Sequence, residues 1–351
     1  MKSKEKFAKK NFPRKLQTSH EGNLQGNYKK INYAKSSKDG VLEFSFSWLF
    51  AIIIGGAIIF LAIFAAVKII GLGNTQSDVT TAREIGIILN PLESSFTTGT
   101  TTSFDVPTET RIYNACDDLD GNFGKEIISV SQKNLGKWSE PENPVGFSNK
   151  YIFSENPIEG KKFYIFSKPL EMPFKVADLI YLTSDSKDYC FEEMPESDLK
   201  NEIGALSSSN PKLQIENCSQ NSIKVCFGSS SGVCNVAVSG FLDEAGYVEK
   251  NGEQMSYAGN ALMIAAIFSE KEIYECQVKR IMKRISSLAI IYSEKSKLIS
   301  KNGCGTNFGS ELINFARTAG GITSSSQINS IMENAKVLED TNQNLGECRL
   351  W

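Results

Sequence analysis

The stretch "KDGVLEFSFSWLFAIIIGGAIIFLAIFAAVKIIG", residues 38–71, decides how the chain is organised. From Phe44 to Val67 it contains 24 residues without a charge. As an α-helix this run would be about 36 Å long, enough to cross a hydrocarbon core of about 30 Å. A secretory signal peptide has a shorter apolar region and a small-residue cleavage site, and no such site follows here. The run therefore predicts a retained transmembrane helix rather than a buried core helix.

Charge on either side of this helix predicts its orientation. Residues 1–40 contain 11 Lys or Arg residues and three acidic residues, whereas residues 71–110 contain a single basic residue, Arg83. Since positively charged flanks stay in the cytoplasm, we expect a cytoplasmic N-terminus and an extracytoplasmic C-terminal part of about 280 residues. The basic tail has few large apolar residues, which predicts disorder.

The part beyond the helix is acidic. Without the tail, Glu43 and Lys68, the chain has 26 basic and 36 acidic residues. This balance argues against nucleic acid as a partner. The expected partners are the lipid bilayer and another protein or a second copy of the chain.

All eight cysteines lie beyond the predicted membrane helix. The even number and the expected compartment favour four disulfides, with buried free thiols as the alternative. Zinc is disfavoured, because the chain has no Cys-x-x-Cys pair and no histidine near a cysteine. The residues concerned are Cys116, Cys190, Cys218, Cys226, Cys234, Cys276, Cys304 and Cys348.

Spacing predicts two of the pairs. Cys226 and Cys234 flank a Gly-Ser-rich turn between two short expected strands, and a hairpin would place them opposite each other. Cys276 and Cys304 would lie near opposite ends of a long helix, too far apart to bond. Helices running back and up again would bring Cys304 to Cys348. Cys276 is then left to pair with one of Cys116, Cys190 or Cys218.

The histidine content excludes several kinds of enzyme. The only histidine is His20, in the basic tail. The part beyond the membrane helix therefore has no Ser-His-Asp triad, no Cys-His pair and no imidazole metal ligand. A glycosidase with a carboxylate pair or a Ser/Lys hydrolase stays open. No residue is assigned to catalysis, a cofactor or a metal.

One acidic stretch, "DDLDGNFGKE" at residues 117–126, begins like a calcium loop. Asp118, Asp120 and Asn122 have the spacing of its first ligands. Position six is Phe123 instead of glycine, however, and position twelve is Ser129 instead of glutamate. We interpret the stretch as an Asp-Gly turn between strands.

The only Asn-x-Ser/Thr sequon is Asn217-Cys218-Ser219. It makes Asn217 a candidate for glycosylation. Its middle residue is also a disulfide candidate, which constrains access to the asparagine.

Residue patterns predict an α+β domain after the membrane helix. A helical continuation should end near Pro91, followed by a polar linker. Residues 150–154 and 161–167 suggest a hairpin, residues 174–184 a buried strand, and residues 195–206 a short helix with Ser197 as N-cap. Three further strands are expected in "KLQIENC", "SIKVCF" and "VCNVAVSG".

Helical periodicity begins near residue 258. Ser269 and Glu272 resemble a capping box, and an apolar stripe follows at spacings of four and three, which predicts a long amphipathic helix ending near Gly303. Two more helices should cover about 308–319 and 326–340. The stripe could also form an intermolecular coiled coil, but packing on the β-rich part is favoured. Its members are Tyr274, Val278, Ile281, Ile285, Leu288 and Tyr292.

These patterns give five predicted regions. They are a disordered basic cytoplasmic tail (1–40), a transmembrane helix (41–72), a juxtamembrane helix and linker (73–103), a β-rich extracytoplasmic domain (104–257) and a helical C-terminal part (258–351).

The stretch "DGVLEFSFSWLFAIIIGGAIIFLAIFA" resembles the N-terminal segment of archaeal type IV pilin-like proteins and of bacterial TadE-like pseudopilins. The resemblance covers about residues 40–66. It implies cleavage after Gly40, an assembly contact by Glu43 with the amine of a neighbouring subunit, and Phe44 as the aromatic that follows the glutamate. Here the glutamate is third after the glycine, whereas those pilins usually have it fifth. The alternative is a glutamate in the headgroup region of an ordinary signal-anchor.

The expected function is non-catalytic: a single-pass anchor displays a disulfide-bonded domain outside the cell for adhesion, envelope assembly or pilus-like association. The alternatives are a histidine-independent extracytoplasmic hydrolase and an accessory subunit of a membrane secretion or pilus machine.

Overall fold

The structure is a computed structural model that describes residues 46–88, 101–119, 123–141, 144–228, 234–304 and 308–351. For residues 69–88 it describes the backbone alone. Helix α1 (Phe46–Ile88) contains a span, Phe46–Lys68, that is long and apolar enough to cross a membrane and has none of its length buried. The expected helical continuation extends to Ile88 in the same helix.

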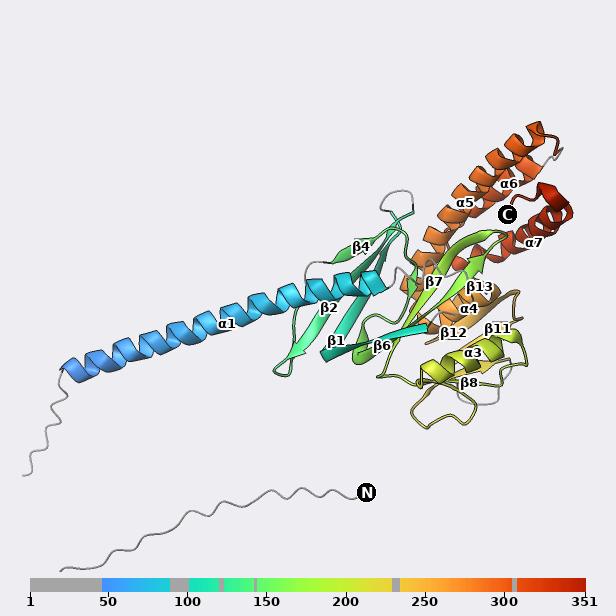
Figure 1. Cartoon of the computed structure of the whole chain (residues 1–351). Coiled ribbons are helices and arrows are strands. Elements are labelled where there is room, and N and C mark those ends of the chain that lie inside the picture. The colour runs from blue at the N-terminus through green and yellow to red at the C-terminus, as the bar shows by residue number, and fades with distance from the viewer. Residues whose placement is uncertain (1–45, 89–100, 120–122, 142–143, 229–233, 305–307) are drawn as a thin grey trace, which may run out of the picture. The chain divides into compact units, whose positions relative to one another are not determined.

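The first sheet has seven strands in the order β3-β2-β1-β6-β7-β5, with β4 also paired to β2 (Figure 1). All its pairs are antiparallel except β5 with β7. Its strands are β1 (Thr101–Asp117), β2 (Lys125–Asn134), β3 (Lys137–Trp138), β4 (Val145–Phe147), β5 (Ile152–Phe153), β6 (Ile158–Glu171) and β7 (Lys175–Ser184). As expected, β7 is buried along nearly its whole length.

The expected hairpin of residues 150–154 and 161–167 is wrong. Strand β5 does not pair with β6 but lies parallel to β7, with Ile152 opposite Ile180. The Asn156-Pro157 signal marks a change of chain direction, but a turn signal does not determine which strand becomes the neighbour.

The second sheet has six strands in the order β13-β12-β11-β10-β8-β9. Strands β9, β8, β10 and β11 are parallel, whereas β11, β12 and β13 are antiparallel. The hairpin expected between β10 and β11 is therefore wrong as well. The strands are β8 (Tyr189–Glu192), β9 (Leu213–Ile215), β10 (Ile223–Phe227), β11 (Val236–Gly240), β12 (Ala245–Lys250) and β13 (Glu253–Ala258).

Helix α3 (Asp198–Ser209) connects β8 to β9 and begins as the sequence predicts. Ser197 is its N-cap, and the side chain of Ser197 accepts a hydrogen bond from the amide of Lys200. Its apolar side, formed by Leu199, Ile203 and Leu206, is buried.

Helix α4 (Gly259–Phe268) contacts strands of both sheets, β6 and β7 of the first and β12 and β13 of the second (Figure 1). Every residue from Asn260 to Phe268 is buried, as expected for a helix that is apolar on all sides. The capping box expected at Ser269 is wrong. Ser269 ends α4, and its hydroxyl donates to the carbonyl of Ala265, so that Glu270 becomes the N-cap of the next helix.

Helices α5 (Lys271–Lys301), α6 (Phe308–Gly320) and α7 (Asn329–Asn344) follow in the order expected. The stripe from Tyr274 to Ile285 is fully buried in the main core, and Leu288 and Tyr292 pack against that core. The chain is thus a mixed α and β structure with one apolar N-terminal helix. A smaller second core lies on one face of the first sheet and includes Ile112, Ile128, Phe163, Ile165, Ile180 and Leu182.

Candidate functional site

Four disulfides join the eight cysteines. Cys226–Cys234 and Cys304–Cys348 agree with the pairs expected from the sequence. Cys276 bonds to Cys116, one of its three expected partners, and this leaves Cys190–Cys218. The Cys226–Cys234 bond spans a connection between parallel strands, so that its pairing was right although the hairpin behind it was not.

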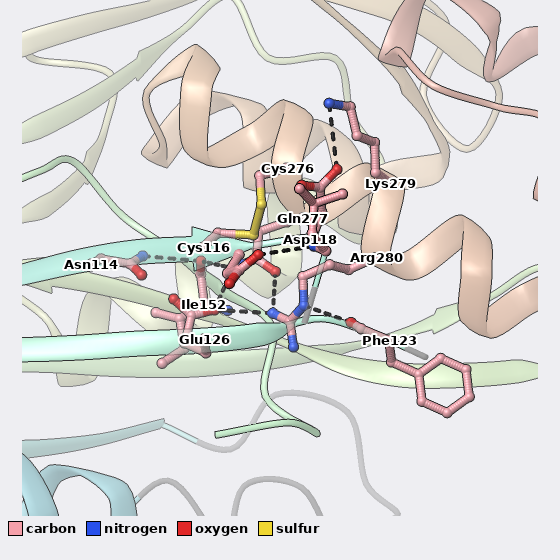
Figure 2. The surroundings of a disulfide bond; sticks show 12 residues. Asn114, Cys116, Asp118, Phe123, Glu126, Ile152, Cys276, Gln277, Lys279 and Arg280 are labelled. Carbon is pink, nitrogen blue, oxygen red and sulfur yellow. Dashed lines mark hydrogen bonds and ion pairs between the residues drawn. A yellow bond between two sulfur atoms is a disulfide. The ribbon is translucent and has the colours of Figure 1, made fainter. Parts of the chain in front are cut away.

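Figure 2 shows a polar cluster beside the Cys116–Cys276 disulfide, formed by Asn114, Glu126, Gln277 and Arg280. It lies where helix α5 meets edge strand β5. Among the described strands, β5 is paired only to β7, and on its other side the side chains of the cluster occupy the hydrogen-bonding positions that a further strand would fill. Because unpaired strand edges invite association with other chains, the cluster protects this edge as well as fixing the helix.

Three side chains bind the backbone of Ile152. Its amide donates to Oε2 of Glu126, over 3.2 Å. Its carbonyl accepts from Nδ2 of Asn114 at 3.1 Å and from Nε2 of Gln277 at 3.2 Å. Since Asn114 and Glu126 belong to β1 and β2, the first sheet must curl until these strands approach β5, and the second core fills the space inside that curve.

Arg280 holds the loops around this edge. Its guanidinium donates to the carbonyls of Phe123 and Lys150, both at 2.9 Å, and of Ser148 at 3.2 Å. It lies 4.7 Å from the centre of the Tyr151 ring. Two segments, one at Phe123 and one at residues 148–151, are therefore tied to helix α5 by one side chain that is fully buried.

Glu126 is the acidic member of the cluster and is also fully buried. Its Oε2 lies 3.4 Å from Nη1 of Arg280 and accepts a hydrogen bond from Gln277, whereas its Oε1 has no hydrogen-bond partner in the described part of the chain. Burial raises the pKa of Glu126 to about 8, although Arg280, Gln277 and the Ile152 amide act in the opposite direction. Burial likewise lowers the pKa of Arg280.

This shift predicts that alkaline pH destabilises the domain. The folded-state pKa of Glu126 lies above the ordinary value of 4.5, so its stabilising contribution is complete below about pH 4.5 and is lost as the pH rises through about 8. Between pH 5 and pH 9 the free energy of unfolding should fall by about 2–4 kcal/mol on this account. Glu126→Gln should remove most of that dependence. Thermal unfolding from pH 5 to pH 9 measures it, and equal slopes in both proteins would contradict the assignment.

The cluster cannot act on a dissolved substrate, because Glu126, Gln277 and Arg280 have no exposed surface. Its role is to position α5. A sequence signal was present: Cys276 and Arg280 are four residues apart and lie off the apolar stripe, so they share another face of the helix. Nothing in the sequence indicated the partner strands, which are more than 120 residues away.

A cavity of about 360 Å³ is the best place to look for the Ser/Lys hydrolase, since it is lined by Ser184, Ser186 and Lys187 together with Glu155. Neither serine contacts the lysine. Both hydroxyls donate to the carbonyl of Glu159, and the Lys187 ammonium forms an ion pair with Glu155. A lysine whose Nζ contacts Glu155 rather than a serine hydroxyl is not placed to remove a proton from serine.

Glu155 is the centre of this second polar group. Tyr189 donates to its Oε1 at 3.1 Å, and Nζ of Lys250 lies 3.5 Å from the same oxygen. Burial alone would raise the pKa of Glu155, but the hydrogen bond from Lys187 and the charges of Lys250 and Lys187 hold that pKa below its ordinary value. Glu155 and its lysine partners therefore form an ion-pair network, which is not the arrangement expected of a general acid or base.

The structure describes only some of the remaining predicted site residues. Gly40, Glu43 and Phe44 lie outside the described residues, as do Asp120 and Asn122 of the calcium-like stretch. The carboxylate of Asp118 forms an ion pair with Lys279 at 3.6 Å. Among the described residues, no group of three or more His, Cys, Asp or Glu side chains could hold a metal ion.

Asn217, the glycosylation candidate, is exposed. Its backbone has a φ of 52°, and the next residue, Cys218, is bonded to Cys190. Asparagine tolerates this left-handed conformation better than most residues do, so the backbone of the turn is sufficient to explain an asparagine at this position.

No protein-family model matches the chain, and searches of curated proteins and of solved structures found no match to it either.

Proposed function

We propose that the chain is a membrane-anchored surface protein that displays a disulfide-stabilised, non-catalytic domain on the extracytoplasmic side, for adhesion, envelope assembly or pilus-like association. The observation that carries the proposal is the combination of one apolar helix, Phe46–Lys68, with four disulfides in the domain that follows. Disulfides persist in oxidising compartments, so they support an extracytoplasmic position for the domain that follows the apolar helix.

The buried polar groups support a structural role for the domain. Glu126 and Arg280 hold helix α5 on an edge strand, and Lys187 is held by Glu155. The carboxylate and guanidinium of the first group are fully buried, and in the second group Lys187 is paired with Glu155 while both serine hydroxyls donate to the Glu159 carbonyl. A rigid domain of this kind suits recognition by another protein.

The orientation can be tested by proteolysis of intact cells. Protease added outside should digest epitopes placed beyond residue 110 and spare epitopes before residue 40, because the basic tail keeps the N-terminus in the cytoplasm. Detergent-lysed cells serve as the control, in which both epitopes should be digested. Digestion of the N-terminal epitope alone in intact cells would contradict the proposal.

The pilus-like form of the proposal makes a separate prediction about processing. If Gly40 precedes a cleavage point, the mature chain begins at Val41 and Glu43 becomes available to a neighbouring subunit's amine, the kind of partner a carboxylate in an apolar environment needs. Intact-mass measurement of the native protein checks this. A mass that includes residues 1–40 would remove the pilus-like form and leave the simple anchor.

A further inference from the structure

The turn between β2 and β3 carries a leucine where its backbone favours another residue. The loop consists of Leu135 and Gly136, since Asn134 pairs with Lys137 across the hairpin. Both loop residues have positive φ angles, 48° and 79°. Two-residue turns with this backbone favour asparagine or aspartate before the glycine, because a branched apolar side chain is strained there.

Packing does not explain the leucine either. The Leu135 side chain is 101% exposed, so the domain gains no buried apolar surface from it. Asparagine at this position would suit the turn better and would expose a polar side chain to water instead of an apolar one. A strained and exposed apolar residue is the kind of outlier from which a contact outside the domain can be inferred.

The residues beside Leu135 indicate what kind of surface it would contact. Residues 133–138 contain two lysines and no acidic residue, in a chain that is otherwise acidic beyond its membrane helix. Lys137 is exposed and has no acidic partner in the described part of the chain, whereas Lys133 is paired with Glu109 at 2.8 Å. Trp138 is half-buried under the guanidinium of Arg111, 4.0 Å from its ring centre. An apolar tip beside lysine and tryptophan is typical of segments that lie in the headgroup layer of a bilayer.

The turn lies at the end of the β1–β2 pair where the chain enters the domain. Strand β2 runs antiparallel to β1, so Leu135 lies toward the Thr101 end of β1, the strand that follows α1 in the sequence.

We propose that the Leu135 turn is a membrane-surface contact, in which Leu135 enters the headgroup region of an anionic bilayer and Lys137 binds lipid phosphates. The inference rests on the proposed membrane anchoring. The anchor keeps the domain beside the bilayer at a high effective concentration, so a single leucine and one or two lysines suffice to orient the domain.

The test uses the full chain in liposomes of phosphatidylcholine and phosphatidylglycerol. All eight native cysteines are disulfide-bonded, so a cysteine introduced by Leu135→Cys is the only thiol that an environment-sensitive fluorophore can label. We expect its emission to shift to the blue, and nitroxide lipids to quench it roughly twofold, since interfacial contacts enter about 5–10 Å. Leu119→Cys is the matched control. Leu119 is 84% exposed and follows β1 at the opposite end of the β1–β2 pair, so its probe should stay in water.

A second measurement starts from a protein that keeps both Leu135 and Lys137. With the probe at Glu140→Cys, an exposed position just after β3, quenching should fall when Leu135→Asn is added, while the melting temperature should stay unchanged or rise because asparagine suits the turn. Probes at 135 and 119 that respond alike would overturn the proposal. A probe at 135 that is shielded in native membranes but unquenched in liposomes would overturn it in favour of a protein pocket. Failure of the chain to float with liposomes would contradict the anchoring itself.

Discussion

Arg280→Ala should lower the free energy of unfolding by about 2–5 kcal/mol, because it truncates a fully buried side chain and leaves carbonyl acceptors without a donor. Arg280 is fully buried and donates to the carbonyls of Phe123, Lys150 and Ser148, besides facing Glu126. The hydrogen bond to the Lys150 carbonyl is buried, and those to the Phe123 and Ser148 carbonyls are partly buried. Each buried unpaired acceptor costs roughly 1–3 kcal/mol, which makes the lower limit of the range secure.

Lys279→Ala is the matched control for this substitution. Lys279 is the preceding residue on the same helix and pairs with Asp118 at 3.6 Å, where both side chains are partly exposed. Surface ion pairs contribute about 0–1 kcal/mol, so this variant should unfold close to the parent protein. Chemical denaturation of the full chain in nanodiscs measures both. Similar losses in the two variants would mean that the cluster around Arg280 does not hold helix α5.

Removing the Cys116–Cys276 disulfide by a double alanine substitution should lower the stability by about 5 kcal/mol in the chain-entropy account. The bond closes a segment with a sequence separation of 160, which is the longest of the four. It also joins the end of β1 to the start of α5, beside the polar cluster (Figure 2). Loss of this bond therefore frees the helix and enlarges the unfolded ensemble.

The double alanine variant of Cys226 and Cys234 is the comparison for that result. Its sequence separation is 8, for which the same account gives about 2–3 kcal/mol. The difference between the two double variants, about 2–3 kcal/mol, is less sensitive to strain than either value alone. Thermal unfolding under non-reducing conditions measures it. If the Cys226–Cys234 variant were the less stable of the two, the Cys116–Cys276 bond would not have its assigned role.

Helices and their caps could be predicted because they depend on local patterns. The Tyr274–Tyr292 stripe has the helical period, and helix α5 follows it. Continuity of that helix separated Cys276 from Cys304 and correctly directed Cys304 to Cys348. Prediction failed where two local signals competed. Ser269 could cap the following helix or end the preceding one, and in the structure it ends the apolar helix α4.

Strand neighbours could not be predicted, because local signals do not contain them. The turn at Asn156-Pro157 and the Gly-Ser segment before Cys234 both indicated hairpins. The strands on either side of the first, β5 and β6, do not pair with each other, and those on either side of the second, β10 and β11, are parallel. Cys226 and Cys234 bond all the same, since a separation of eight residues keeps them close whichever way the strands run.

The polar cluster illustrates the limit for sites. Glu126 and Gln277 are 151 residues apart and their side chains meet across an edge strand that was assigned to another partner. A buried glutamate looks like any other acidic residue in a strand when only the sequence is known. Leu135 is the converse case, because its positive φ and full exposure become visible only once the turn is built.

The account's central claim is that an anchored domain is held by four disulfides in an oxidising compartment. Peptide mapping of the native protein, with thiols alkylated at the moment of cell lysis, tests it most directly. We predict no alkylated cysteine and a linked pair of peptides containing Cys116 and Cys276. Alkylation of these cysteines in freshly lysed cells would contradict the account, because it would place the domain in a reducing compartment.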